Sequence, residues 1–431
     1  MAEIILRVPW GEAAKEFRLP EESVAWTISP KAISPVPDEK AEILRAMREP
    51  IGMPAIPEVL GDPAGKRIAI VVDDNTRVTP VNRILPVVVN ELNRYGVEDS
   101  QITVIIALGS HRYMTPEEIE KRVGSECYRR LRIINHEYDN PAELSYCGET
   151  KFGSPVYVNR SFVESDFGMC IGNIIPHFVA GWSGGAKSIQ PGICGKETTA
   201  AVHLNSSLDW PERFGNAEND IRLDIEEIAK KAGLRFILNT ILNLKEEVVH
   251  VVAGEPRAAH RRGVQYAQEV YQQEVTVRPD VVIVGSYPAN RDLWQAGKAL
   301  AAGCMSVRKG GTIILAAPCF EGAYPEHPDV MQLGTMDPER IFHLSKTGQF
   351  SDVVGSTGYI SAGVMRQMAK VILVSEGIDR ETTEYLGYTY APSLKEAIAI
   401  ARGFEGEAAT FGLLTHGADL VPRVIEQAEG L

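Results

Sequence analysis

The sequence predicts an α/β protein with two Rossmann-like α/β domains, parallel-rich sheets and an active-site cleft between the domains. Short apolar segments end abruptly in polar, glycine-containing loops, often followed by a helix, which is typical of parallel α/β sheets. This pattern restarts after about residue 270. A chain of 431 residues is also long enough for two or three domains.

The composition narrows the class of protein. The formal charge is −13 and no long basic block is present, so we expect no nucleic-acid partner. No apolar run of about 18 residues occurs, and the N-terminus lacks a basic region followed by an apolar one, so we expect neither a membrane span nor a secretory signal. The six cysteines are scattered without a CxxC pair, which indicates small buried residues rather than a zinc or redox motif. A cytoplasmic enzyme is the resulting expectation.

The first domain is expected to span residues 1–270. It opens with a predicted β-hairpin, EIILRV and KEFRL, which we expect to form a small added sheet, and the proline-rich stretch SPKAISPVPDEKAEIL then leads into a helix. The predicted strands are RIAIVV (67–72), ITVIIA (102–107) and DFGMCIG (166–172). A helix is expected near NRILPVVVNELNRYG, and Thr115, Pro116 and Glu118 resemble the capped start of another.

The second domain is expected to span residues 271–404 and to contribute substrate-binding residues. Its strand pattern reads DVVIVG (280–285), GTIILAAP (311–318) and KVILVSEG (370–377), and a similar segment, FGLLTHGAD, follows at 411–419. The C-terminal tail, about 405–431, is expected to pack back on the first domain.

Three predicted strands of the first domain are followed by loops rich in chemically active side chains. The loops read DDNTRVTP, LGSHR and HFVAGWSGGAKSIQPGICGKETTAAVH, and their candidate residues are Asp73, Asp74, Arg77, His111, His177, Lys187 and His203. Because ligands bind outside the carboxyl ends of parallel strands, we expect these residues at one sheet edge, facing the cleft. Each histidine taken alone is more readily explained as a structural or surface residue.

The segment GWSGGAKS is close to a phosphate-binding P-loop, but Ala186 stands where that motif needs glycine. The mismatch argues against a nucleotide triphosphatase. Gly184 and Gly185 would still let the backbone approach a phosphate or a flat ring closely, with Lys187 supplying a charge or an amine.

Two other groups of polar residues have alternative interpretations. Asp73 or Asp74 could cap the next turn and pair with Arg77, or Arg77 could bind a substrate carboxylate through its planar fork. In the second domain, Gln295 and Lys298 are three residues apart at a helix start and share a face. They could project into the cleft or form a solvated surface.

The motifs DDNTRVTP, GSHR, IPHFVAGWSGGAKSIQPG, AVHLNSSL and WQAGK together resemble the nickel-pincer-nucleotide lactate racemase family. The resemblance covers nearly the whole chain and keeps the order of the motifs. It implies a racemase or epimerase of 2-hydroxy acids. The implied cofactor is nickel pyridinium-3,5-bisthiocarboxylic acid mononucleotide, covalently attached to Lys187, with His203 as the protein ligand of the nickel.

The resemblance implies roles for the remaining candidates. It assigns acid/base roles to His111 and His177, substrate binding to Arg77, Trp294, Gln295 and Lys298, and cofactor binding to Asp73, Gly184 and Gly185. Two histidines suit a racemase, because a near-neutral pKa serves both protonated and deprotonated duties on the two faces of the stereocentre. Hydride transfer from C2 to the cofactor and back avoids a poorly stabilised carbanion, and the protein binds and orients the cofactor.

The sequence departs from the lactate-specific pattern on the substrate side. Trp294 replaces a tyrosine, Tyr359 is the nearest aromatic residue in GSTGYISAG where a tryptophan is usual, and Val78 replaces a proline. A different 2-hydroxy acid is therefore plausible, such as malate, 2-hydroxyglutarate, an aryl-lactate or an aldonate, with Asn82 and Arg83 reading a second polar group.

The expected partners are this small carboxylate and the proteins that make the cofactor, and the sequence indicates no oligomeric state. One alternative function is a binding or storage protein that holds the cofactor without turnover. The other is a conventional nucleotide-binding α/β enzyme.

Overall fold

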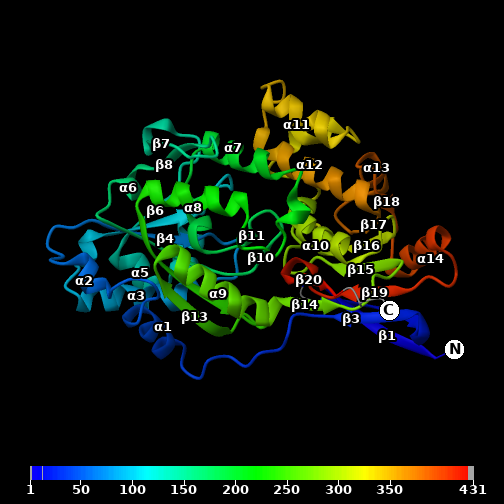
Figure 1. Cartoon of the computed structure of the whole chain (residues 1–431), viewed down its shortest axis with the longest axis horizontal. Helices are drawn as coiled ribbons and strands as arrows, with labels where there is room; N and C mark the ends of the chain where they lie inside the picture. The colour runs from blue at the N-terminus through cyan, green and yellow to red at the C-terminus, as the bar shows by residue number, and fades with distance from the viewer. Residues whose placement is uncertain (1, 12, 426–431) are drawn as a thin grey trace, which may run out of the picture.

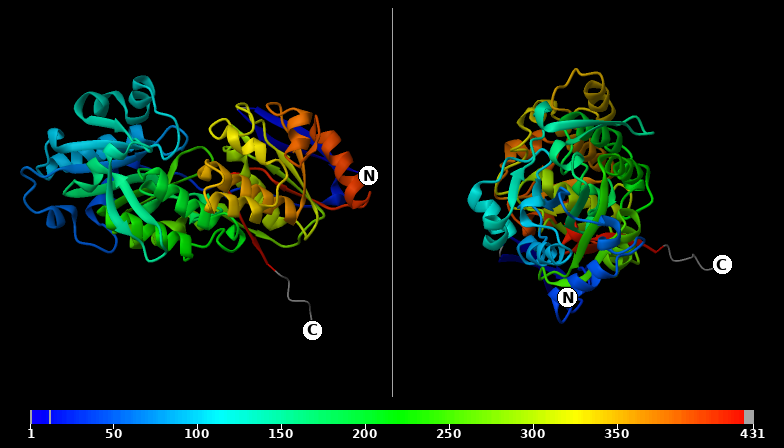
Figure 2. Two further views of the ribbon diagram at one scale, coloured as in Figure 1. Left: turned by 90° about the horizontal axis from the view of Figure 1, so that it is seen from above. Right: turned by 90° about the vertical axis from the view of Figure 1, so that its left-hand side faces the viewer.

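The computed structural model describes residues 2–11 and 13–425, which form two α/β lobes side by side (Figures 1 and 2). Each lobe is built around a six-stranded sheet with helices packed on both faces. This arrangement confirms the predicted fold class.

The first sheet has the strand order β13-β12-β9-β4-β5-β6, and only the β12–β13 pair is antiparallel. Its strands are β4 (Ile68–Asp73), β5 (Ile102–Ala107), β6 (Arg132–Asn135), β9 (Phe167–Asn173), β12 (Leu234–Leu242) and β13 (Val248–Gly254). The predicted strands at 67–72, 102–107 and 166–172 are β4, β5 and β9. Because β4, β5 and β9 are parallel neighbours, their following loops leave the same edge of the sheet.

Alternation along β4 explains the two layers of helices. Ile70 and Val72 pack on one face in the core that includes α1 and α3, whereas Ala69 and Val71 pack on the other face in the core that includes α8. The helices of this lobe are α1 (Glu39–Arg48), α2 (Ile56–Leu60), α3 (Val81–Arg94), α4 (Pro116–Val123), α5 (Ser125–Arg130), α6 (Arg160–Val163), α7 (Lys196–Ser206), α8 (Asp220–Ala232) and α9 (Pro256–Tyr271). The predicted start of α4 is confirmed, because the Glu118 N–H donates to the Thr115 hydroxyl and the Thr115 N–H donates to the Glu118 carboxylate.

The second sheet has the order β18-β17-β16-β15-β19-β3, and all of its strands are parallel. They are β3 (Val24–Ile28), β15 (Val281–Gly285), β16 (Thr312–Ala316), β17 (Lys370–Val374), β18 (Thr389–Tyr390) and β19 (Phe411–Leu414). The helices of this lobe are α10 (Leu293–Ser306), α11 (Pro338–Lys346), α12 (Val353–Met368), α13 (Arg380–Tyr385) and α14 (Leu394–Glu405). The predicted strands at 280–285, 311–318 and 370–377 are β15, β16 and β17.

The N-terminal segment belongs to the second lobe, so the prediction of a first domain spanning 1–270 is wrong for residues 3–28. The hairpin of β1 (Glu3–Trp10) and β2 (Ala13–Pro20) forms as predicted, but its apolar face packs on β15, β16 and β17. β3 then pairs with β19 at the edge of the second sheet. In Figure 2 the N-terminus accordingly lies beside α14, in the lobe formed by the C-terminal half of the chain.

The C-terminal segment also differs from the prediction. Within the predicted tail, β19 lies inside the second sheet rather than on the first domain. β20 (Val421–Val424) pairs with β14 (Gln272–Val275) between the lobes, and Val421 packs against Trp182 and Tyr271 of the first lobe. The last part of the predicted tail, 426–431, lies outside the described residues.

Smaller elements complete the fold. The short strand pairs are β7 (Leu144–Glu149) with β8 (Pro155–Asn159) and β10 (Pro176–His177) with β11 (Gly181–Trp182). All six cysteines are free thiols, and five of them are buried, as predicted. None of the helices described in residues 2–11 and 13–425 has the length and apolar character needed to cross a bilayer.

Candidate active site

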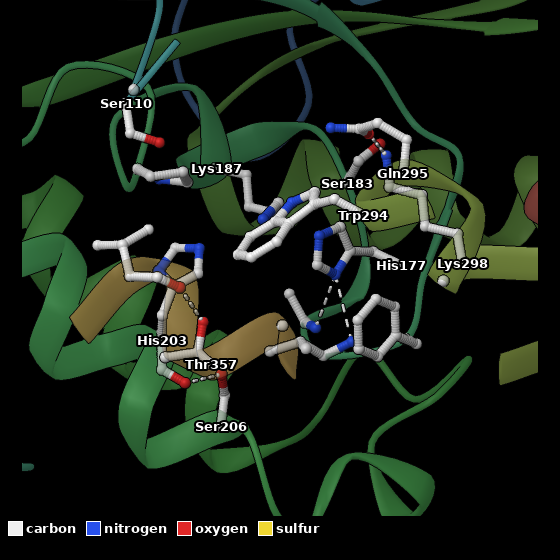
Figure 3. Close-up of a pocket in the computed structure, with 18 of the residues that line it drawn as sticks. Ser110, His177, Ser183, Lys187, His203, Ser206, Trp294, Gln295, Lys298 and Thr357 are labelled. Atoms are coloured by element: carbon white, nitrogen blue, oxygen red, sulfur yellow. Dashed lines mark hydrogen bonds between the residues drawn. The ribbon is translucent and has the colours of Figure 1, made fainter. Parts of the chain in front are cut away.

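A cavity of about 200 Å³, the inner chamber, lies between the lobes and collects most of the predicted site residues. From the first lobe it is lined by Asp73, Asp74, Arg77, His111, His177, Gly184, Lys187 and His203, and from the second by Trp294, Gln295 and Lys298. Figure 3 shows His177, Lys187, His203 and Trp294 turned toward a common space. The structure thus brings together loops that follow β4, β5 and β9 with the start of α10.

His111 is paired with Asp74 across the ends of two adjacent strands. Its Nδ1 lies 2.7 Å from Asp74 Oδ2, and Asp74 is only 2% exposed. Burial alone would raise the pKa of Asp74, but the hydrogen bond and charge of His111 outweigh it, and the pKa is held well below its usual range. The ionised Asp74 accepts a hydrogen bond from the Nδ1–H of His111, so in the neutral form of the ring the lone pair is on Nε2.

The loop that carries Arg77 is held in place by the side chains of Asp74 and Arg122. Asp74 Oδ1 accepts hydrogen bonds from the backbone N–H and the hydroxyl of Thr76, as expected for a turn-capping aspartate. Arg122, on α4, donates to the backbone carbonyls of Asp73 and Arg77. Among the described residues, Arg77 donates only to Thr76, and it forms no ion pair with either aspartate. Its guanidinium charge is therefore available to a ligand carboxylate.

His177 has a different hydrogen-bond arrangement. Its Nδ1 accepts the backbone N–H groups of Val179 and Ala180, both at 3.2 Å (Figure 3). An accepting Nδ1 places the proton of the neutral ring on Nε2. Burial, and after it the charges of Lys187 and Lys298, lowers the pKa of His177 well below its ordinary value. His177 is consequently a neutral hydrogen-bond donor toward the chamber.

Lys187 lies on a short 3₁₀ turn, η4 (Gly185–Ser188), which begins with two consecutive glycines, Gly184 at the N-cap and Gly185 in the first position. Gly184 has φ +71°, and a Cβ there would lie 2.8 Å from the Asn173 carbonyl oxygen, so no other residue fits. Arg222 is buried and donates to the carbonyls of Trp182 and Gly184. Burial, followed by the charge of Arg222, lowers the pKa of Lys187 well below its ordinary value. Burial therefore favours the neutral form of the amine, which is the nucleophilic one.

His203 presents a free ring nitrogen from α7. Its Nδ1 lies 2.9 Å from the Thr199 carbonyl oxygen one turn earlier and donates to it. That bond leaves the lone pair on Nε2, which is the form of histidine that ligates metals. Burial lowers the pKa of His203 to about 4. Within the described part of the chain, no three His, Cys, Asp or Glu side chains gather as a metal site.

The start of α10 places two polar side chains against the first lobe. Asp292 caps the helix by accepting the Gln295 N–H at 2.8 Å, and Lys298 Nζ donates to Gln295 Oε1 at 2.8 Å. Burial, and then the charge of Arg77, lowers the pKa of Lys298 to about 7. The predicted shared face of Gln295 and Lys298 is thus turned into the cleft rather than toward solvent.

Trp294 forms a wall of the chamber through contacts that the sequence analysis missed. Its ring stacks on His327, with centroids 4.8 Å apart, and His327 is paired with Asp352 at 2.9 Å. On α12, a Cβ at Gly358 would lie 2.6 Å from the Trp294 ring, so the glycine makes room for the indole. Tyr359 points elsewhere, since it is buried and donates to the Gly334 carbonyl.

Three further polar residues line the inner chamber without complete hydrogen bonding. Both amide atoms of Gln190, the Thr199 hydroxyl and the Asn173 amide nitrogen are buried and have no hydrogen-bond partner in the described part of the chain. Buried polar groups normally have partners, so these groups indicate a polar ligand or water. Gln190 and Thr199 lie in the long loop that the sequence analysis singled out, but none of the three was among the predicted site residues.

Three expectations do not agree with the geometry. Gly185 does not line the chamber, and its glycine is explained by a φ of +57° and by His260, which a Cβ would meet at 3.0 Å. Arg83 bonds to Glu39 and to a backbone carbonyl, outside both the inner chamber and the cavity that adjoins it. Asn82, next to it on α3, is likewise absent from both cavities.

Comparison with known proteins agrees with the geometry. The sequence model of the lactate racemase N-terminal domain matches residues 10–215, and that of the C-terminal domain matches residues 274–421. The chain is 29% identical over 427 residues to the lactate racemase of Thermoanaerobacterium thermosaccharolyticum, covering 97% of this chain and 99% of that protein. It is also 29% identical over 395 residues to the lactate racemase of Lactiplantibacillus plantarum, covering 89% and 91%.

Solved structures give the same result. The lactate racemase apoprotein from Thermoanaerobacterium thermosaccharolyticum superimposes with a TM-score of 0.87 at 27% identity, covering 97% of this chain and 100% of that one. A protein from Thermotoga maritima shares the fold, with a TM-score of 0.69 at 21% identity over 90% of this chain and 99% of that one. Both halves of the sequence and the fold as a whole therefore place this chain in the lactate racemase family, whose members are enzymes of the racemase type.

Proposed function

We propose that this protein inverts the C2 stereocentre of a 2-hydroxy acid, with a nickel-pincer nucleotide attached to Lys187. The observation that carries the proposal is one chamber containing a nucleophilic amine, a metal-competent imidazole and two histidines in complementary tautomers. The Asp74–His111 pair presents a base, and His177 presents an N–H donor.

The residues of the inner chamber fit such a cofactor. Burial lowers the pKa of Lys187 and so favours the neutral amine that covalent attachment requires, and His203 Nε2 is free to ligate nickel. The partnerless groups of Gln190, Thr199 and Asn173 suit the ribose and phosphate of a mononucleotide. When bound, this cofactor would accept the C2 hydrogen as hydride and return it.

The other residues act on the substrate. Arg77 carries a guanidinium without an acidic partner, and Lys298 lies beside it, so the two bind the substrate carboxylate. His111 Nε2 takes the proton of the C2 hydroxyl as its Nδ1–H stays bonded to Asp74. The Nε2–H of His177 donates to the substrate oxygen from another side of the chamber.

The test is to co-express the chain with the cofactor-making enzymes, which we propose as its partners, and to weigh the intact protein. We expect a covalent adduct that is lost in Lys187→Ala and kept in the exposed control Lys245→Ala. Chiral chromatography of lactate and other 2-hydroxy acids then measures inversion, which His111→Ala and His177→Ala should each abolish while keeping the adduct. An adduct without inversion of any 2-hydroxy acid would favour a storage protein, and the absence of an adduct would overturn the proposal.

A further inference from the structure

A second cavity of about 390 Å³, the outer chamber, shares lining residues with the inner chamber but is not lined by Lys187. Both chambers are lined by Arg77, His111, Gln295 and Lys298. The polar lining that belongs to the outer chamber alone includes Asn75, Arg112, Arg291, Glu321, Glu326 and Asp419. The four shared residues therefore separate a cofactor side from a side open to the rest of the substrate.

The position of the shared residues directs the C2 substituent of the substrate. If Arg77 and Lys298 hold the carboxylate and His111 reaches the C2 hydroxyl, the third group on C2 extends into the outer chamber. On the other side, the Trp294 ring, backed by His327, closes the wall of the inner chamber. The volume of the outer chamber greatly exceeds the ~10–15 Å³ that one water molecule needs. A methyl group would leave most of it filled with water.

The charges of the outer chamber are already matched within the protein. Arg112 donates both terminal nitrogens to Glu118, at 2.7 and 2.8 Å. Arg291 lies 2.9 Å from Asp292, 3.0 Å from Glu326 and 3.4 Å from Glu321. Among the described lining residues, no cation beyond Arg77 and Lys298 is left over for a second carboxylate, and Glu321 and Glu326, which share one arginine, would repel it.

The same lining is unsuited to an aromatic substituent, which would remove charged groups from water without replacing their hydrogen bonds. Hydroxyl groups suit it, because each hydroxyl can donate to a carboxylate and accept from an amide or guanidinium N–H. Asn75 supplies an amide donor beside Glu118, to which it is bonded at 3.2 Å.

We propose that the substrate is a 2-hydroxy acid whose C2 substituent carries further hydroxyl groups, that is, an aldonic acid. Other stereocentres remain unchanged when C2 is inverted, so the reaction is an epimerisation. This inference rests on the proposed function, because the C2 substituent enters the outer chamber only if Arg77 and Lys298 anchor the carboxylate.

The test compares substrates on the holoenzyme. Five- and six-carbon aldonates, lactate, malate and phenyl-lactate are incubated with adduct-bearing protein, and C2 inversion is followed by NMR and chiral chromatography. We expect kcat/KM for an aldonate to exceed that for each of the other acids at least tenfold. Preference for lactate, malate or phenyl-lactate would overturn the inference and leave the proposed function intact, whereas missing adduct and missing inversion of every acid would overturn the proposed function.

A double variant checks the role of the carboxylates. Glu321→Gln with Glu326→Gln removes two negative charges and leaves Arg291 with Asp292 as its remaining acidic partner, so the ratio of kcat/KM for aldonate over malate should fall at least tenfold. Glu164→Gln is the matched control, since Glu164 also pairs with an arginine but lies outside both chambers. An unchanged ratio in the double variant, at equal adduct occupancy, would contradict the assignment of the outer chamber.

Discussion

Replacing Asp74 by asparagine tests the chemistry of the His111 side of the site. Asparagine has the shape of aspartate, and its Oδ1 can still accept the Thr76 N–H and hydroxyl that hold the turn. Its amide nitrogen, however, would then face His111 Nδ1 as a donor. The proton of the neutral imidazole would move to Nε2, and the lone pair needed to accept the substrate hydroxyl proton would be lost.

The size of the effect follows from the contact that is lost. The 2.7 Å bond between His111 Nδ1 and a 2% exposed carboxylate is charge-assisted once the ring is protonated. Such bonds contribute about 1.5–3 kcal/mol, which corresponds to roughly a 10- to 150-fold lower kcat. The wrong tautomer adds to this loss, so we expect a decrease of at least about 100-fold.

The assay is the rate of C2 inversion, normalised to the fraction of protein carrying the adduct. Asp62→Asn is the control. Asp62 also accepts a hydrogen bond from a backbone N–H two residues along the chain, but it is exposed and is not a hydrogen-bond partner of His111. A kcat for Asp74→Asn within threefold of wild type, at equal adduct occupancy, would refute the role assigned to the Asp74–His111 pair.

Three further predictions follow from the chambers. Burial lowers the pKa of Lys298 to about 7, so its ammonium group loses its proton as the pH rises through 7. The KM of the wild-type enzyme should therefore increase from pH 7 to 9, whereas the KM of Lys298→Arg should stay constant. A KM that is constant with pH in wild type would contradict this prediction. Gln190→Leu removes buried partnerless atoms, so Tm of the apoprotein should hold or rise while adduct occupancy falls; a lower Tm with full occupancy would be the opposite result. Gly358→Ala would place a Cβ 2.6 Å from the Trp294 ring, so we expect it to lower the free energy of unfolding by about 1–3 kcal/mol, measured by thermal unfolding. Gly403→Ala is the control, because a Cβ at Gly403 meets open space and should not destabilise the protein.

Strand positions could be predicted because the physical cause is local. In β4, residues 68–72 are buried on both faces, and a continuous apolar run that ends at Asp73 is the direct signature of such a strand. The sheet to which a strand belongs is not local. β3 pairs with β19, and nearly the whole chain lies between these two strands in the sequence. The residue pattern near the N-terminus therefore could not show to which lobe β3 belongs.

The same distinction holds for the site. His111 and Arg77 were found because parallel neighbours β4 and β5 end at one edge, and this adjacency could also have revealed the Asp74–His111 pair. No such pattern predicts Gln190 as a site residue. It is recognised only in the folded chamber, where both of its amide atoms are buried without a hydrogen-bond partner among the described residues. The fit of Trp294 to Gly358 likewise joins two helices that only tertiary packing brings together.

The two histidines are not equivalent, and this has a consequence for inversion in both directions. His111 presents a lone pair at Nε2 because Asp74 holds the proton of Nδ1, whereas His177 presents an N–H at Nε2 because Val179 and Ala180 donate to its Nδ1. In the proposed reaction, the neutral His177 can donate a hydrogen bond from Nε2, but it cannot release that proton without becoming an imidazolate anion. To act as an acid or a base at Nε2, the ring must carry a proton on Nδ1, and the N–H groups of Val179 and Ala180 must then turn away from it. We therefore expect the segment 178–180 to change conformation during the proposed reaction, while the buried Asp74–His111 pair stays in place.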